Sequence, residues 1–325
     1  MRTLLRWIAR IVVVLLVLIV GLWAFGPREP VDLAAKFSAD GIGSDPDQYL
    51  AEREAQFDDI TPGGEKRIIW SDEPGQRTSQ VIVYLHGFSA TSEEIRPVPD
   101  EVATKLGANL YFARLKGHAR SGDALATATV ADWARDYDEA LAVAAAIGDE
   151  IIILSTSTGA TLAAAMLAEG RGDNVKGVAM ISPNFRVANP AAAVLTFPAA
   201  RTWVPALFGA DRSFEPMNEG HAKWWTTAYP STALFPMAAI VKHAFEADYA
   251  SVGTPALFLF ADSDQVVDHR ATREVASKWG GEVTIETVVP GAGDDPLHHV
   301  ISGDILSPGM NDKTVDILLN WIEGL

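Results

Sequence analysis

The stretch from residue 151 to residue 168 constrains the fold more than any other part of the chain. An aliphatic run, Ile151 to Leu154, precedes the small residues 155–161, and a segment rich in alanine and leucine follows. The aliphatic run predicts a buried strand and the alanine-rich segment a helix, so the small residues must form a sharp turn. Ser157 lies in that turn and is a candidate nucleophile. The alternative is a hydroxyl-rich helix N-cap after an ordinary strand.

Strands and helices are predicted to alternate from Arg67 to the C-terminus. The predicted strands are Arg67–Trp70, Val81–His86, Asn109–Arg114, Ile151–Leu154, Val178–Ser182, Ala256–Phe260 and Val283–Val288. The predicted helices include Val130–Ile147, Ala160–Ala168, Ala271–Trp279 and Lys313–Glu323. Near-continuous apolar strands that alternate with helices predict an α/β fold, with a mostly parallel sheet covered by helices on both faces.

Residues 184–253 interrupt this alternation. The segment has no convincing buried strand and is rich in Pro, Phe and Trp. An insertion of this length in a compact domain predicts a cap or lid, and the alternative is a helical appendage that only stabilises the fold. We therefore expect an α/β core from residues 67–183 and 254–325, with the cap between its two parts.

The N-terminus carries a long apolar segment, from Leu4 to Phe25, with arginines only on its N-terminal side. Its length suffices to cross a bilayer, which takes about 20 residues. A cleaved signal peptide is the alternative, but Pro27 would then begin the mature chain. We expect a retained anchor over residues 1–26, with a cytoplasmic N-terminus and the body on the extracytoplasmic (periplasmic) side. Residues 27–66 would form a stalk with one helix, Asp47 to Phe57, packed on the main domain.

The charge of the chain limits its partners. The formal net charge is −16, which disfavours nucleic acid, because binding nucleic acid requires a basic surface. The chain contains no cysteine, which excludes disulfides, cysteine nucleophiles and thiolate zinc sites.

An activated serine requires a histidine base and an acid that orients the base. The predicted strand Ala256–Phe260 runs into an acidic turn, and carboxylates at such a strand end lie where open α/β sheets bind ligands. We take Asp264 as the acid. Asp262 and Asp268 are the alternatives, with helix capping and solvation as their other roles.

Two histidines follow the last predicted strand. His299 directly precedes the apolar pair Val300 and Ile301, so packing should fix its position better than that of His298. We take His299 as the base. A metal site at this pair is disfavoured, because neighbouring residues rarely bind one ion and no third ligand is near.

The oxyanion of a tetrahedral intermediate requires two backbone donors. The predicted strand Val81–His86 leads into Gly87, which lets the chain bend so that the next amides point into the site. The amides of Phe88 and Thr158 are the predicted pair, and His86 is expected to hold the loop by hydrogen bonds.

Five motifs in this order resemble those of α/β-hydrolases of the serine esterase and monoacylglycerol lipase type. The motifs are His86-Gly87-Phe88, Arg114-Leu115-Lys116-Gly117-His118, Ser155-Thr156-Ser157-Thr158-Gly159, Asp264-Gln265-Val266-Val267 and His299-Val300-Ile301. The resemblance implies an eight-stranded sheet, a Ser-His-Asp triad, an oxyanion hole, no cofactor and a cap inserted after the sixth strand. Two departures are Ser155, where the elbow motif G-x-S-x-G has glycine, and Ala119, where glycine often follows the histidine.

The sequence thus predicts a membrane-tethered serine esterase or lipase that cleaves a monoacylglycerol or another ester of an apolar acyl chain. Ser157 would attack the carbonyl, His299 would transfer the proton and Asp264 would fix the histidine tautomer. Two other functions stay open. One is an acyltransferase or thioesterase that uses the same acyl-enzyme, and the other is a catalytically silent anchored protein that binds a lipid or a partner.

Overall fold

The computed structural model describes residues 2–325, whose central feature is a seven-stranded sheet in the order β1-β3-β2-β4-β5-β8-β9. Every neighbouring pair is parallel except β1 and β3, which are antiparallel. The strands are β1 (Arg67–Ile69), β2 (Thr78–Leu85), β3 (Asn109–Phe112), β4 (Gly148–Thr156), β5 (Val175–Ile181), β8 (Ala256–Phe260) and β9 (Val283–Thr287). The mostly parallel sheet predicted from the sequence is confirmed.

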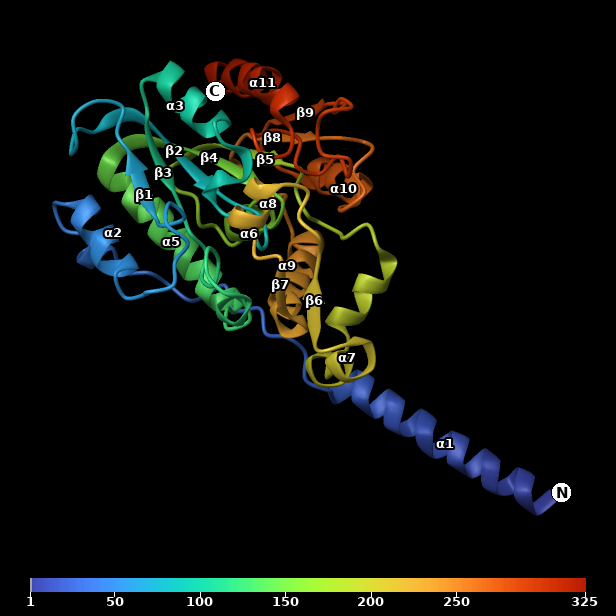
Figure 1. The fold of residues 1–325 in the computed structure, drawn as a ribbon. Helices are drawn as coiled ribbons and strands as arrows, with labels where there is room; N and C mark the ends of the chain where they lie inside the picture. Colours follow the sequence, from blue (N-terminus) through green and yellow to red (C-terminus); the bar gives the residue numbers. More distant parts are fainter. Residues whose placement is uncertain (1) are drawn as a thin grey trace.

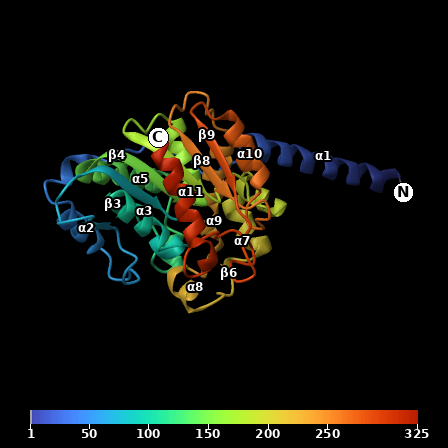
Figure 2. The same cartoon turned by 90° about the horizontal axis from the view of Figure 1, so that it is seen from above.

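The sheet lies between two layers of helices because alternate side chains of each central strand point to opposite faces. In β2, Val81 and Val83 pack in one core cluster, and Ile82 and Tyr84 pack in the other. The first face is covered by α5 (Val130–Ile147), α6 (Thr158–Ala168) and α10 (His269–Lys278). The second is covered by α3 (Val98–Leu106) and α11 (Asn311–Glu323), which lie side by side in Figures 1 and 2.

The sheet has seven strands instead of the eight that the family resemblance implies. In the described residues, β1 is an edge strand, and the chain before it forms helix and loop. Short turns complete the core: η2 (Ser92–Ile95), α4 (Gly122–Leu125) and η5 (Pro308–Met310).

Residues 184–253, here called the inserted segment, join β5 to β8, so they follow the fifth strand of the chain. Their elements are η3 (Pro190–Thr196), α7 (Ala200–Phe208), β6 (Asp211–Ser213), α8 (Glu219–Trp224), β7 (Ala228–Pro230), η4 (Ser231–Ala233) and α9 (Leu234–Glu246). The short strands β6 and β7 form a separate antiparallel pair. Leu195, Val204 and Phe235 belong to a small hydrophobic cluster of the segment itself, beside the main core.

The N-terminal helix α1 (Arg2–Phe25) extends away from the body (Figure 1). Its apolar part, Thr3–Phe25, is 23 residues long and is the one helix in the described residues that is long and apolar enough to cross a membrane. At about 1.5 Å per residue it measures about 34 Å, close to the thickness of a hydrocarbon layer.

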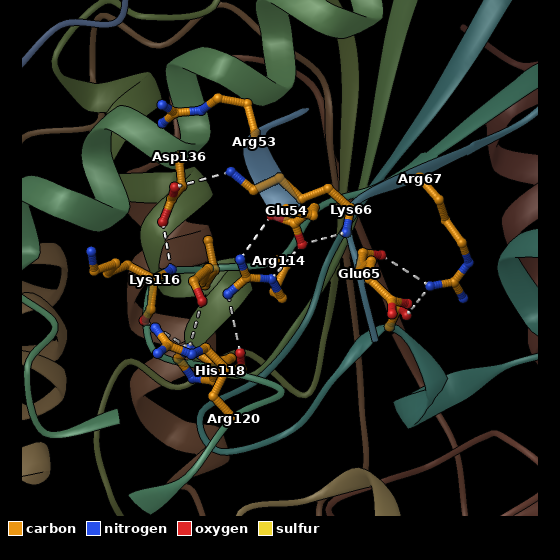
Figure 3. A network of polar contacts seen from close by, with 12 residues as sticks. Arg53, Glu54, Glu65, Lys66, Arg67, Arg114, Lys116, His118, Arg120 and Asp136 are labelled. Atoms are coloured by element: carbon orange, nitrogen blue, oxygen red, sulfur yellow. Dashed lines mark hydrogen bonds and ion pairs between the residues drawn. The ribbon is translucent and has the colours of Figure 1, made fainter. Parts of the chain in front are cut away.

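Residues 27–66 run from α1 along the body and contain η1 (Ala39–Gly41) and α2 (Pro46–Glu54). The carbonyls of Leu33 and Ala35 accept hydrogen bonds from Arg171, at 2.6 and 3.1 Å. The buried carboxylate of Glu54 binds Arg114 through two nitrogens, at 2.6 and 2.7 Å. Figure 3 shows the Arg114 guanidinium between Glu54 and the backbone of His118. Buried polar contacts thus fasten this segment to the core.

Candidate active site

The turn between β4 and α6 is strained at Ser157, where φ is 50° and ψ is −115°. A non-glycine residue adopts a positive φ only where the surrounding structure enforces it. Here the helix begins very close to strand β2, because a Cβ on Gly159 would lie 2.4 Å from the carbonyl oxygen of Leu85. The close approach accounts for glycine at position 159, and the strained turn holds Ser157 at the end of the strand.

Ser155 fits the first position of this turn without distortion. Its side chain is fully buried, and its hydroxyl donates a hydrogen bond of 3.1 Å to the carbonyl of Ala179 in β5. A buried hydroxyl that lacked such an acceptor would be costly. The departure from glycine at this position is therefore compatible with the elbow.

His299 connects Ser157 with Asp264. Its Nε2 lies 3.0 Å from Ser157 Oγ, and its Nδ1 lies 2.8 Å from Asp264 Oδ2. Since a carboxylate only accepts, Nδ1 carries the proton, and Nε2 is free to accept from the serine hydroxyl. Burial lowers the pKa of the His299 imidazole, but the carboxylates of Asp264, Glu94 and Asp295 outweigh burial and raise the pKa above its usual value. The imidazole is thus a stronger base than an ordinary histidine.

The acidic turn after β8 fixes Asp264 through its other carboxylate oxygen. Oδ1 accepts the amides of Val266 and Val267, at 2.8 and 3.0 Å, which leaves Oδ2 for His299. The two alternative acids lie elsewhere. Asp262 is exposed and pairs with Arg273, and Asp268 caps α10 through the amide of Arg270.

His298 points away from the serine. Its Nδ1 lies 2.6 Å from Ser263 Oγ on the exposed side of the turn, and its backbone has φ 55°. Of the two adjacent histidines, the structure brings only His299 to Ser157. Within residues 2–325, no group of three or more His, Cys, Asp or Glu residues is placed to bind a metal ion.

The two predicted oxyanion donors line the same cavity as Ser157 and His299. These are Phe88, in the loop after β2, and Thr158, the first residue of α6. The first amides of a helix have no partner within the helix, so Thr158 has a free donor. His86 holds the loop as expected, since its Nε2 accepts the amide of Leu115 at 3.1 Å. Burial lowers the pKa of His86 to about 4, which keeps its ring neutral.

Glu94 is a buried acid at the site that the sequence analysis did not single out. Its Oε2 accepts the amide of Gly87 at 2.7 Å and the hydroxyl of Tyr84 at 3.0 Å. The Tyr84 hydroxyl also lies 3.0 Å from Thr156 Oγ1, directly before Ser157. This chain of contacts joins the loop after β2, here called the oxyanion loop because it carries the predicted donor Phe88, to the turn that carries Ser157. Burial raises the pKa of Glu94 to about 7, against its hydrogen bonds to Gly87 and Tyr84. Two adjacent glutamates, Glu93 and Glu94, are typical of a solvated turn, so the sequence does not indicate that Glu94 is buried.

Asp295 is a second buried acid that was not singled out. Its Oδ2 accepts the amides of His299 and Val300, both at 2.9 Å, and its Oδ1 accepts that of Leu297 at 3.0 Å. The carboxylate thus shapes the loop that presents His299. An aspartate directly before a proline is a turn signal that could have located it.

A cavity of about 350 Å³ opens above these groups. Ser157, His299 and Glu94 line part of it, and apolar side chains of the inserted segment line another part, here called the apolar wall. The apolar wall includes Phe214, Trp225, Tyr229, Leu234 and Met237. Such a cavity suits a small molecule with an apolar part next to the reacting group.

A serine in a strained strand-to-helix turn, bound to a histidine that a carboxylate orients, is the arrangement of serine hydrolases. The sequence model of the Alpha/beta hydrolase family matches residues 82–302, more than half of the chain. The chain therefore belongs to the alpha/beta hydrolase family. No curated protein matches it in the sequence search.

Several solved structures share this fold at low sequence identity. A structure of the metagenome-derived lipolytic enzymes LipS and LipT matches with a TM-score of 0.67 at 19% identity, covering 82% of this chain and 100% of its own. The monoacylglycerol lipase of Paleococcus ferrophilus matches with a TM-score of 0.59 at 13% identity, covering 79% of this chain and 96% of its own. A soluble variant of the monoglyceride lipase of Saccharomyces cerevisiae matches with a TM-score of 0.61 at 9% identity, covering 80% of this chain and 91% of its own. At these identities the likeness concerns the fold.

Proposed function

We propose that this protein is a serine hydrolase that cleaves carboxylic esters of apolar acyl chains through an acyl-enzyme on Ser157. The observation that carries the proposal is the continuous hydrogen-bonded line from Ser157 Oγ through His299 to Asp264, at 3.0 and 2.8 Å. No further group is needed to activate the serine, because the histidine already accepts from its hydroxyl.

The reaction follows from these positions. Ser157 Oγ attacks the ester carbonyl while its proton passes to His299 Nε2, and the amides of Phe88 and Thr158 donate to the oxyanion. The imidazolium then protonates the leaving alcohol, which departs as the carbonyl reforms on the serine. A water molecule then attacks the acyl-enzyme carbonyl while one of its protons passes to His299, and the imidazolium returns this proton to Ser157 Oγ as the acid departs. Asp264 keeps its charge throughout and stabilises the imidazolium.

The cavity supports an apolar acyl group. A second cavity of about 640 Å³ shares Val187 with the first, and its lining includes the apolar Leu195 and Phe245 as well as charged side chains such as Arg186 and Asp268. Two structural neighbours are lipases of monoacylglycerols, so a monoacylglycerol is the first natural ester to test. The inserted segment would act as the cap over this space.

Helix α1 would hold the protein in a membrane. Its N-terminal part carries Arg6 and Arg10, and no charged residue follows Arg10 within the helix. This asymmetry of positive charge favours a cytoplasmic N-terminus and an extracytoplasmic body. The acidic body would be repelled by anionic headgroups without such a tether.

A serine-directed fluorophosphonate probe tests the nucleophile. The wild-type protein should be labelled and should hydrolyse p-nitrophenyl esters, and Ser157→Ala should do neither. Ser155→Ala is the matched control, because it removes a hydroxyl two residues away and should stay labelled. Labelling of Ser157→Ala would refute the assignment. Labelling without ester hydrolysis, even with alcohol acceptors present, would favour a protein that binds lipid or a partner.

A further inference from the structure

The C-terminal end of α1 contacts the inserted segment directly. The ring of Trp23 packs edge-on against Phe197, with 5.0 Å between the ring centroids. Two residues after the helix, the carbonyl of Pro27 accepts the amide of Ala199 at 2.6 Å. Figure 1 shows α7 beside this end of α1. The helix therefore meets the body at the start of α7.

Two arginines hold this junction. Arg28 Nη1 donates to the carbonyl of Thr196 at 3.0 Å, and its guanidinium lies 5.2 Å from the centre of the Trp23 ring. Arg201, in α7, binds both carboxylate oxygens of Glu29, at 2.8 and 2.7 Å. A bidentate pair of this kind fixes orientation as well as distance. The position of α7 relative to the end of α1 is thus set by several independent contacts.

Helix α7 has one buried face and one exposed apolar face. Ala200 and Val204 pack in the small cluster of the inserted segment. In contrast, Leu207 is 71% exposed and Phe208 is 59% exposed, and Phe197 beside the junction is 37% exposed. Since the helix has nine residues, no part of it is farther than about 12 Å along its axis from the junction. The exposed side chains therefore lie near the level at which α1 leaves the hydrocarbon.

The charges around this surface differ from those of the rest of the protein. Three arginines contact this region, Arg28 at Thr196, Arg201 at Glu29 and Arg212 at Phe208. The whole chain, in contrast, has a net charge of −16. Arg212 caps α7, with Nη1 at 3.1 Å from the carbonyl of Phe208. Arginine next to exposed aromatic and aliphatic side chains suits the headgroup region of a bilayer.

We propose that Phe197, Leu207 and Phe208 form a membrane-contact surface that lies in the headgroup region of the bilayer that α1 spans. The inference rests on the role of α1 as an anchor, given under the proposed function. The continuity of this surface with the end of α1 identifies its partner as a lipid bilayer. Because the inserted segment also forms the apolar wall of the cavity, the ester it takes up is one dissolved in that bilayer.

Single-cysteine labelling tests the surface, since the natural chain has no cysteine to remove. An environment-sensitive nitrobenzoxadiazole label on Phe208→Cys, in the full chain reconstituted into phosphatidylcholine and phosphatidylglycerol vesicles, should be quenched by headgroup spin-labelled lipid. A label on Asn320→Cys, in α11 at the far end of the body in Figure 1, should not be. Val14→Cys, in the middle of α1, reports on the anchor, and its label should be quenched by lipid that is spin-labelled near the end of the acyl chain. Quenching at Val14 without quenching at Phe208 would overturn the proposal. Absence of quenching at both positions would show that α1 does not span the bilayer, which the proposal requires.

An activity assay provides a second test of the membrane-contact surface. The double variant Leu207→Ser with Phe208→Ser should lose at least fivefold in kcat/KM toward a monoacylglycerol held in vesicles, and it should keep the wild-type rate toward a water-soluble short-chain ester. Equal losses of kcat/KM on both esters, or no loss on either, would contradict the proposed membrane contact. If neither ester is cleaved by the wild type, the proposed function fails, and the quenching experiment still decides where α7 lies.

Discussion

Replacing Glu94 tests whether a buried acid holds the oxyanion loop in place. Glu94→Ala removes the acceptor of the Gly87 amide, which would then be buried without a partner, at a cost of about 1–3 kcal/mol. The loop can relieve that cost only by moving, and the Phe88 amide would move with it. Loss of one oxyanion donor lowers kcat by about 10²–10³-fold in enzymes of this chemistry. We therefore expect about a 100-fold lower kcat for Glu94→Ala, with little change in KM.

Glu94→Gln separates the hydrogen bond from the charge, because its amide oxygen can still accept from Gly87. We expect its kcat to stay within about threefold of the wild type. Glu93→Ala is the control, since Glu93 pairs with Arg67 and Arg96 one residue away. The assay is p-nitrophenyl ester hydrolysis together with the affinity for a boronic acid, which mimics the tetrahedral intermediate. A kcat for Glu94→Ala within twofold of the wild type would refute the reasoning.

The raised pKa of Glu94 also predicts how stability changes with pH. A carboxyl whose pKa rises from 4.5 to about 7 on folding binds its proton more tightly in the folded state. The stability this provides is present below pH 4.5 and is lost as pH rises through 7, in total about 3 kcal/mol. In Glu94→Gln this contribution is absent. Urea unfolding of the two proteins at pH 5 and pH 8 measures it, and equal pH dependence would contradict the prediction.

Three further substitutions probe the framework of the site. Asp264→Asn should lower kcat by about 10⁴-fold, because the amide no longer enforces the tautomer of His299, and p-nitrophenyl ester hydrolysis measures the loss. Gly159→Ala should abolish fluorophosphonate labelling and destabilise the protein by about 3 kcal/mol, because its Cβ would lie 2.4 Å from a carbonyl oxygen of β2. Glu54→Ala should cost about 3–5 kcal/mol in urea unfolding, because it leaves Arg114 buried without its carboxylate, whereas the exposed Glu52→Ala should change little.

The strand pattern and the candidate site could be predicted because both leave local signals. Aliphatic runs marked the central strands, and small residues at 155–161 marked the turn of Ser157. The acid and the base each follow a strand, so the parallel sheet brings Asp264 and His299 to one edge although they are far apart in sequence. Predicted helix boundaries were less accurate. The helix expected from Asp47 to Phe57 spans Pro46–Glu54, and it begins one residue earlier because Asp45 caps it by accepting the amide of Gln48.

Other features depend on contacts between distant segments and left no such signal. The role of Glu94 requires Tyr84 and Gly87 to meet it, which only the folded loop provides. Helix α3 (Val98–Leu106) begins Val98-Pro99, and it was not predicted. The strand number implied by the family was wrong, because the chain before β1 packs as α2 and not as a further strand. Sequence patterns thus located the candidate groups that the structure brings together, Ser157, His299 and Asp264, and not the residues that hold them.

The path of residues 27–66 has a mechanical consequence. Leaving α1, the chain is fastened first to the inserted segment, by Pro27 and Glu29, and then to the core, by the carbonyl of Leu33 on Arg171. A pull along α1 is therefore borne by α7 before it reaches the sheet. Because the inserted segment also lines the cavity, a displacement of α1 would reach that lining before it reached Ser157 and His299, which lie on the core.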